Sequence, residues 1–491
     1  MGLDYETAVG LEVHAELCTK TKIFCGCQNA FGAQPNTLCC PVCMGLPGAL
    51  PVLNRQAVDD AIRMGHALCC SINRVSRLDR KNYFYPDLPK AYQITQRDVP
   101  LCEHGSVQIL VDGVVRRIGI TRVQLEEDAG KLMYDDSADG ILADYNRCGV
   151  PLIEIVSEPD LRSAKEAKIF LETITGILLT LGISDAKMQE GSIRADVNVS
   201  IRPCGGQELG TRTEMKNIGS FGAVYRAIEY EARRQMAVVR GGGVIEQQTR
   251  RWNDAKGKSC VMRTKEDAQD YRFFPDPDLP ALEVSKAHVQ ALKHTIPELP
   301  VAKALRYIRE YGLCAADALL LASGKERSAF FDSCAEHKRC DPISIVHWML
   351  GDIAKILNER RMEITDTALT SENLTEMIAL IECGRLSGTA AKGVLESIME
   401  RDVAPKKLVE EMGLAQISDP ETLLKIVNGV LSQNSKAVAD YQCGKTNAIG
   451  FLVGQCMKAS KGKGNPTLLR EMIVSALKQP KKPDQKAPVA K

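Results

Sequence analysis

The stretch VGLEVHAEL at residues 9–17 alternates, after its glycine, between apolar and ionisable side chains. Successive side chains of an extended chain point to opposite faces of a sheet, so the stretch is predicted to form a half-buried β-strand. Its polar face then carries Glu12, His14 and Glu16, which places an imidazole between two carboxylates. Taken alone, such a face is also typical of the solvated side of an antiparallel sheet.

Two later stretches repeat this alternation, at residues 193–202 and, in a shorter form, at residues 212–216. Their polar faces carry acids with bases between them: Arg194, Asp196, Asn198 and Arg202 in the first, and Glu214 and Lys216 in the second. Carboxylates bind divalent cations, whereas Arg and Lys bind phosphoryl oxygens. The three stretches together predict a sheet whose polar face is a candidate active site.

Length and composition indicate a soluble protein of more than one domain. A chain of 491 residues exceeds what one hydrophobic core usually supports, so we expect two to three domains. A hydrophobic content of 44% and a charged content of 25% are typical of soluble globular proteins, and no apolar run reaches the length of a bilayer span. Because residues 1–6 lack the basic and apolar regions of a signal peptide, we expect a cytoplasmic location. With a net charge of +1, any nucleic acid must bind a local patch.

The cysteines indicate a metal site. In a long chain of this kind, 18 cysteines favour reduced thiols over disulfides. A CxC pair precedes a CPxCxG motif, and this pattern resembles a zinc ribbon, in which thiolates on tight turns converge on one tetrahedral ion. The alternative is buried free cysteine, which we expect for Cys69 and Cys70. The predicted zinc ligands are Cys25, Cys27, Cys40 and Cys43, with Cys39 as the alternative to Cys40.

Two further acidic sites lie after or within predicted strands. Glu126, Glu127 and Asp128 follow a strand-like stretch and precede a glycine, so a metal-binding role is an alternative to ordinary solvated surface. Glu154 is the one charge within an apolar stretch. A carboxylate in that setting requires a partner or an ion, because an isolated buried carboxylate is costly.

The other stretches before residue 281 predict strands, loops and helices without a clear chemical role. Asp112-Gly113 predicts a two-residue turn between strands at residues 107–111 and 114–120. Prolines exclude a regular helix or strand at residues 79–93, whose cations and aromatics suit phosphate and base contacts or, equally, an aromatic-anchored loop. The proline-dense segment at residues 270–280 predicts a rigid connector and a domain boundary. Helical periodicity predicts helices at residues 54–68, from Ser163 to Gly182, and from residue 224 to about residue 241.

From residue 295 onward helical periodicity replaces the strand pattern. We predict an α+β domain at residues 1–293 with the cysteine insert near residues 25–43, a helical domain at residues 294–402, a tail domain at residues 403–478 and a disordered basic end at residues 479–491. Four lysines of the tail region lie among glycines and form a candidate phosphate-contact surface, although a solvated loop explains them equally well. They are Lys445, Lys458, Lys461 and Lys463.

Several of these motifs together resemble the B subunit of the tRNA-dependent amidotransferases, GatB, over nearly the whole chain. The motifs are GLEVH at residues 10–14, DRKNYFYPD at residues 79–87, EEDAGK at residues 126–131, PLIEIVSEPD at residues 151–160 and GFLVGQ at residues 450–455. The resemblance implies a fold of the α+β class, a cradle of mainly antiparallel sheets with helices similar to glutamine synthetase. An all-α helical domain and a small all-α tail domain that binds tRNA would follow it.

The resemblance also implies a reaction. ATP phosphorylates the side-chain carboxylate of mischarged Glu-tRNA(Gln) or Asp-tRNA(Asn), and ammonia then replaces the phosphate. The A subunit supplies ammonia from glutamine, and a small C subunit completes a heterotrimer. A carboxylate is a poor electrophile, so an acyl phosphate supplies a leaving group, and metal ions neutralise the charge gathered between ATP and the acid. The chain has no P-loop and no recognisable glutaminase nucleophile, in agreement with such a role.

Site residues follow from the same resemblance. One Mg²⁺ is expected on His14, Glu127 and Glu154, with Glu126 as the alternative to Glu127. A second cation is expected on Glu12, Asp196 and Glu214. Contacts to phosphate and to the tRNA end are expected from Lys81, Tyr83, Arg194, Arg202 and Lys216.

Two classes of function remain open at this point. One is the catalytic part of a ligase, and the other is a zinc-stapled tRNA-binding adaptor whose acids are structural. The ligase requires its acids and its histidine in one pocket, whereas the adaptor lets them scatter. The sequence does not distinguish Glu-tRNA(Gln) from Asp-tRNA(Asn) as the substrate.

Overall fold

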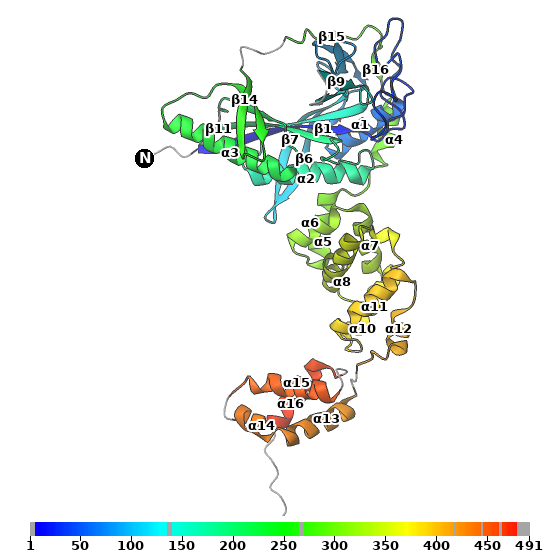
Figure 1. The fold of residues 1–491 in the computed structure, drawn as a ribbon, viewed down its shortest axis with the longest axis vertical. Coiled ribbons are helices and arrows are strands. Elements are labelled where there is room, and N and C mark those ends of the chain that lie inside the picture. The colour runs from blue at the N-terminus through cyan, green and yellow to red at the C-terminus, as the bar shows by residue number, and fades with distance from the viewer. Residues whose placement is uncertain are drawn as a thin grey trace, which may run out of the picture. The chain divides into compact units, whose positions relative to one another are not determined.

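A computed structural model of the chain describes residues 5–134, 140–264, 270–416, 419–442, 445–460 and 464–478. These residues form two compact units (Figure 1). The first unit comprises the residues up to Glu310 together with Cys314–Lys325, and the second comprises Tyr311–Leu313 and the residues from Glu326 onward. The first unit therefore extends beyond residue 293, where we predicted a boundary. The predicted basic end at residues 479–491 lies outside the described residues.

A nine-stranded sheet dominates the first unit, in the order β14-β13-β12-β11-β1-β10-β7-β6-β2. All neighbours in it are antiparallel except β12 and β13. The alternating stretch at residues 9–17 forms most of the central strand, β1 (Tyr5–Glu16), which confirms the prediction. The bounds of the other strands are β2 Ser71–Ile72, β6 Cys102–Val111, β7 Val114–Glu127, β10 Pro151–Ser157, β11 Ile193–Pro203, β12 Thr213–Lys216, β13 Gln248–Asn253 and β14 Lys258–Thr264.

The apolar side of β1 is fully buried, because Val9, Leu11, Val13 and Ala15 belong to one large core cluster. Three helices before residue 241 contribute buried residues to the same core, and the second and third of them, α2 and α3, lie side by side beneath the sheet (Figure 1). Each is capped at its start, since the Asn54, Ser163 and Ser220 side chains accept a backbone N–H of the first turn. The predicted helices are thereby confirmed as α1 Arg55–Ala67, α2 Ala164–Leu181 and α3 Phe221–Arg240.

Two proline-rich segments differ from prediction. Both ends of the loop at residues 79–93 are strands, β4 (Asp79–Asn82) and β5 (Tyr92–Thr95), which pair with each other. The segment at residues 270–280 is not a boundary, because β15 (Phe274–Pro275) pairs with β4. Arg80 holds it by donating to Asp276 at 2.7 Å. Local proline content could not reveal partners nearly two hundred residues away.

Four short strands complete the sheets: β3 Val75–Ser76 with β16 Leu282–Glu283, and β8 Lys131–Tyr134 with β9 Ile141–Asp144. After β16 the first unit is helical. Helix α5 packs onto the sheet domain, because Pro300 lies next to Gly176 of α2. The helices of this part are α4 Lys286–Lys293, α5 Pro300–Tyr311 and α6 Ala315–Ala322.

The second unit is helical throughout its described residues. Helix α12 contacts α10 and α11 and buries Leu408 and Val409. The last four helices share a separate small core of Leu423, Val427, Leu452, Leu469 and Ile473. Among the described residues, no helix is both long and apolar enough to cross a membrane. The α-helices are α7 Lys325–Glu336, α8 Pro342–Trp348, α9 Ala354–Arg360, α10 Ser371–Glu382, α11 Gly388–Glu400, α12 Pro405–Glu411, α13 Pro420–Gln433, α14 Ser435–Gln442, α15 Ala448–Ala459 and α16 Pro466–Lys478.

Candidate active site and metal centres

The pairing register of β1 with its two neighbouring strands determines which side chains lie next to one another on the polar face of the sheet. His14 lies opposite Glu154 on β10 and opposite Arg194 on β11. Glu12, two residues earlier, lies opposite Asp196. Side chains that face each other across antiparallel strands have Cβ atoms about 4.5–5.5 Å apart, so these groups can share a ligand.

The first group consists of His14, Glu126 and Glu154, whose ligand atoms all lie within 4.8 Å of one another. Hydrogen bonds orient both acids, because Gln93 donates to Glu126 at 2.5 Å and Gln124 donates to Glu154 at 2.7 Å. Burial, with the nearby Glu126 and Glu12 carboxylates, raises the pKa of Glu154 to about 7, although His14 acts in the opposite direction. A cation between these residues would relieve this unfavourable burial of acids.

Glu127 does not join the first group. It is next to Glu126 in a strand, so its side chain points to the other face of the sheet. There the Nζ of Lys90 lies 2.5 Å and 2.7 Å from its two carboxylate oxygens, and the backbone N–H of Ile94 donates to it at 2.8 Å. The structure therefore brings the alternative, Glu126, to His14 and Glu154.

The second group consists of Glu12, Asp196 and Glu214, again with ligand atoms within 4.8 Å of one another. Asn198 donates to Glu12 at 3.0 Å, and Thr249 donates to Glu214 at 2.7 Å. The ammonium of Lys216 bridges the other two carboxylates, Asp196 and Glu214. Although burial opposes the shift, Lys216 and then Thr249 lower the pKa of Glu214.

Members of both groups line one polar cleft of about 380 Å³. Glu126 and Glu127 do not line it. Its other charged residues are all cationic: Lys81, Arg212, Lys216 and Arg263. The sequence analysis did not single out Arg263 or Tyr271, which also line the cleft. Neither residue carried a sequence signal, because β14 has no regular alternation of polar and apolar side chains and Tyr271 reaches the cleft from an irregular segment.

The predicted phosphate-contact residues fall in four places, of which Arg194 occupies one by itself. Lys81 lines the cleft with its Nζ 5.0 Å from the ring centroid of Tyr271, and Tyr83 packs edge-on against the same ring. Lys216 belongs to the second group. Arg202 lies apart from the cleft, where it donates to Glu6 at 2.6 Å.

Arg194 belongs to a partly buried charge network beside the first group. It donates to Asp128 at 2.7 Å, and Arg147 lies 3.5 Å from the same carboxylate. Burial and the Asp128 carboxylate raise the pKa of Glu16 to about 8, whereas the two arginines keep the pKa of Asp128 low despite its burial. Glu16 is therefore the protonated partner of the pair and hydrogen-bonds to Asp128.

The four predicted cysteines form a third group, with sulfur atoms within 4.8 Å of one another. The Sγ atoms of Cys40 and Cys43 lie 3.9 Å apart, which fits the separation of about 3.8 Å between thiolates that ligate one zinc tetrahedrally. The Cys25 hydrogen bond lowers the pKa of Cys43 to about 4. Cys39 points instead to Asn146, at 3.8 Å, so Cys40 is the fourth member, and the four cysteines could hold a metal ion.

Two of the four tail lysines belong to the described residues. Lys445 forms an ion pair with Asp440 at 3.0 Å, and Lys458 lies in the last turn of α15. Lys461 and Lys463 lie outside the described residues.

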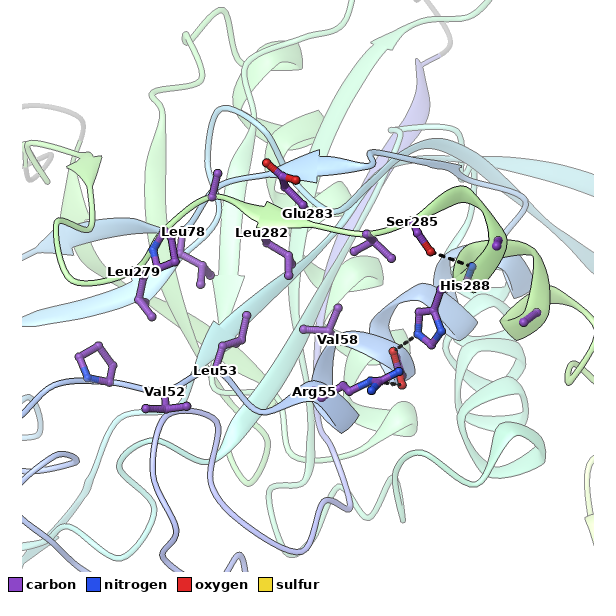
Figure 2. A pocket seen from close by; sticks show the side chains of 17 residues that line it. Val52, Leu53, Arg55, Val58, Leu78, Leu279, Leu282, Glu283, Ser285 and His288 are labelled. Carbon is purple, nitrogen blue, oxygen red and sulfur yellow. Dashed lines mark hydrogen bonds and ion pairs between the residues drawn. The ribbon is translucent and has the colours of Figure 1, made fainter.

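A larger hollow of about 1000 Å³ lies elsewhere, among α1, α4 and β16 (Figure 2). Its walls are mainly apolar, with Val58, Leu78 and Leu282 facing the space, and His288 contacts Asp59 at 2.7 Å on one side. None of the acids of the two groups lines it. Size therefore does not identify the chemical site, and the smaller polar cleft does.

The comparisons with known proteins all indicate the same family. Residues 7–290 match the family model described as the GatB/GatE catalytic domain, and residues 329–477 match one described as the GatB domain. Proteins named as the B subunit of aspartyl/glutamyl-tRNA(Asn/Gln) amidotransferase from Caldicellulosiruptor bescii and Caldicellulosiruptor saccharolyticus are each 52% identical over 480 residues, which cover 97% of this chain and 100% of theirs. The protein of that name from Thermoanaerobacter sp. strain X514 is 50% identical over 475 residues, with the same coverage.

Proposed function

The chain belongs to the GatB/GatE family, and from this premise we propose that it acts as the B subunit of an ATP-dependent aspartyl/glutamyl-tRNA(Asn/Gln) amidotransferase. Its task is to activate the side-chain carboxylate of Glu-tRNA(Gln) or Asp-tRNA(Asn) by phosphorylation, so that ammonia forms the amide. The products, Gln-tRNA(Gln) and Asn-tRNA(Asn), serve translation in the cytoplasm. The A and C subunits complete the enzyme, and the first of these supplies the ammonia from glutamine.

One observation carries this proposal. Glu12, His14, Glu154, Asp196 and Glu214 come from four strands and line a single cleft with four cations. An adaptor with structural acids has no need for this convergence, because each acid could pair with its own surface cation. Phosphoryl transfer does need it, since catalysis rests on positioning and on neutralising phosphate charge.

The donor sets fit divalent cations. We assign one Mg²⁺ to His14, Glu126 and Glu154, and a second cation to Glu12, Asp196 and Glu214. Oxygen ligands suit Mg²⁺, and when bound such ions neutralise phosphoryl oxygens and orient ATP toward the carboxylate. Hydrogen bonds from Gln93, Gln124, Asn198 and Thr249 hold the acids in place, as the donors around metal ligands commonly do.

We assign the cationic side chains of the cleft to substrate binding. Lys81, Arg212 and Arg263 line the cleft around the acids, where guanidinium and ammonium groups can bind phosphate oxygens of ATP and of the tRNA end. Tyr83 and Tyr271 hold Lys81 against their rings, which limits the positions of its ammonium. The four-cysteine group holds a structural zinc, because four thiolates leave no open position for catalysis. The helical tail, with Lys445 and Lys458, contacts the tRNA body.

The decisive experiment is an assay of the complex reconstituted with the A and C subunits. With ATP and ammonium chloride, in the absence of glutamine, the complex should convert at least one of the two mischarged tRNAs to the amidated form. It should release ADP as the amide forms. Glu12→Gln should abolish both products while tRNA binding persists. Amidation without ATP consumption, or full activity of Glu12→Gln, would point to the adaptor function.

A further inference from the structure

Lys216 occupies the middle of the second acidic group. Its ammonium contacts a carboxylate oxygen of Asp196 and lies 2.9 Å from an oxygen of Glu214. The remaining acid, Glu12, accepts a hydrogen bond from the side-chain amide of Asn198 at 3.0 Å. The chain thus places a cation of its own where the second metal ion is expected.

The strand geometry explains this position. Lys216 follows Glu214 by two residues on β12, so both side chains project from the same face of the sheet. From there the lysine reaches Asp196 on the neighbouring strand β11. Its side chain is 31% exposed, and it lines the cleft, so solvent-filled space lies beside it.

An ammonium and a divalent ion disfavour each other at these oxygens. They compete for the same lone pairs and repel each other at close range. If a divalent ion entered while Lys216 stayed, the ammonium would lose its partners inside a partly buried cleft, which is unfavourable for a charge. Lys216 therefore needs a new anionic partner before the ion can bind, and the phosphates of ATP are such a partner.

We propose that Lys216 fills the second cation position until ATP binds, and that its ammonium then moves to the nucleotide phosphates as a divalent ion takes its place. The inference rests on the proposed function and adds an order of binding to it. The first ion, on His14, Glu126 and Glu154, binds the free enzyme. The second ion enters only with nucleotide, so the acids of the second group do not retain a stray cation between catalytic cycles.

The test counts Mn²⁺ ions on the zinc-loaded complex by electron paramagnetic resonance. Mn²⁺ prefers oxygen ligands, whereas the cysteine group retains zinc. The wild type should bind about one Mn²⁺ per chain without nucleotide and about two with a non-hydrolysable ATP analogue. Lys216→Met, which keeps the length of the side chain and removes its charge, should bind the second ion without nucleotide, at least tenfold more tightly than the wild type.

Two further variants serve as controls. Lys216→Arg retains a cation in the second group and should keep the wild-type count, which also excludes a folding defect as the cause. Lys81→Met is the matched control, because Lys81 lines the same cleft but contacts aromatic rings and none of the three acids. It should leave the nucleotide-free count unchanged.

A second ion on the nucleotide-free wild type, or the same count for Lys216→Met and the wild type, would overturn the inference. Failure of the proposed function gives a different result. In that case the wild type would bind fewer than two Mn²⁺ ions with the ATP analogue and would amidate no tRNA. If only the assignment of Lys216 is wrong, two ions still bind with the analogue and tRNA is still amidated.

Discussion

His14 on β1 lies directly opposite Glu154 on β10, and this pair joins the two halves of the polar face. On one side of it Glu126 completes a group of possible ligands, and on the other side Glu12, two residues earlier on the same strand, begins the second group. One strand thus contributes to both groups. A shift of its register by one residue would turn all its acids into the core.

The first prediction concerns this pair. His14→Ala and Glu154→Ala should each abolish amidation of mischarged tRNA with ammonium as well as with glutamine, because neither residue serves the ammonia supply. Glu172→Ala, on the exposed side of α2, is the control and should retain activity. The measurement is the rate of amidated tRNA formation by the complex with each nitrogen donor. Near-normal ammonium-dependent activity in either variant would refute the metal assignment.

A second prediction separates the neighbours Glu126 and Glu127. Glu126→Gln should weaken Mn²⁺ binding with little change in thermal stability. Glu127→Gln should instead cost about 3 kcal/mol of folding free energy, because it leaves the nearly buried Lys90 ammonium without its charge partner. Mn²⁺ titration and denaturant unfolding of both variants measure the two effects. The reverse pattern would restore Glu127 as the ligand.

Strand alternation made most of the sheet face predictable. It correctly gave the polar faces of β1, β11 and β12, and helical periodicity gave α1 and α2. Applied to β7, the same alternation separates Glu126 from Glu127, because Gln124 and Glu126 share a face that Glu127 does not. The position of Lys216 was not predictable, since side-chain reach across strands depends on three-dimensional spacing.

Pairings over long sequence distances were equally hidden. The proline content of residues 270–280 indicates a connector when it is considered locally. In the structure, however, Phe274 pairs with Arg80 across two strands, and the Asp276 carboxylate accepts a hydrogen bond from the guanidinium of the same arginine. The loop chemistry of DRKNYFYPD likewise predicted contacts to ligands, but Arg80 serves the fold and only Lys81 of its cations lines the cleft. Residue type gives the kind of contact, whereas the partner depends on the fold.

The third prediction compares the neighbouring cysteines 39 and 40. Protein purified without chelator should carry about one zinc per chain. Cys40→Ser should lose the zinc and lower the melting temperature, because the remaining three thiolates cannot close the coordination shell. Cys39→Ser, one residue away, should keep both, since its sulfur points to Asn146. Metal analysis that finds no zinc in the wild type, or equal loss in both variants, would contradict the assignment.

The fourth prediction is a pH dependence caused by Glu16. Its pKa is raised to about 8, so the folded chain binds a proton that the unfolded chain has already released. The stability contributed by neutral Glu16 is therefore complete at low pH and is lost as the pH rises through about 8. Glu16→Gln keeps a donor toward Asp128 and cannot ionise. Relative to the wild type, it should gain on the order of 2 kcal/mol between about pH 6 and about pH 9.

Thermal unfolding at both pH values measures this difference, with Glu172→Gln as the exposed control on α2. The control should show the same offset from the wild type at each pH. An offset of Glu16→Gln that does not change with pH would mean that the proton does not reside on Glu16.

The last prediction concerns the tail, and the structure indicates where to cut it. Helix α12 packs on α10 and α11, whereas α13–α16 have their own core. Ending the chain after Gln416 therefore removes the four tail helices and keeps α12 in place, whereas a cut at Pro405 would delete α12 and expose the surfaces of α10 and α11 against which it packs.

An aminoacyl-tRNA presents its reactive end far from its elbow, so a second contact surface on a separate domain raises affinity through effective concentration. The truncation after Gln416 should therefore raise the KM for tRNA without changing the binding of ATP or Mn²⁺ in the cleft. Because the interaction is ionic, the salt dependence of tRNA binding should flatten by about one unit of slope for each phosphate that the tail no longer binds. Lys458→Ala in the full chain should reproduce part of this effect, whereas Lys445→Ala should have less, since Lys445 already pairs with Asp440. Unchanged affinity together with an unchanged salt slope would show that the tail serves packing and not tRNA.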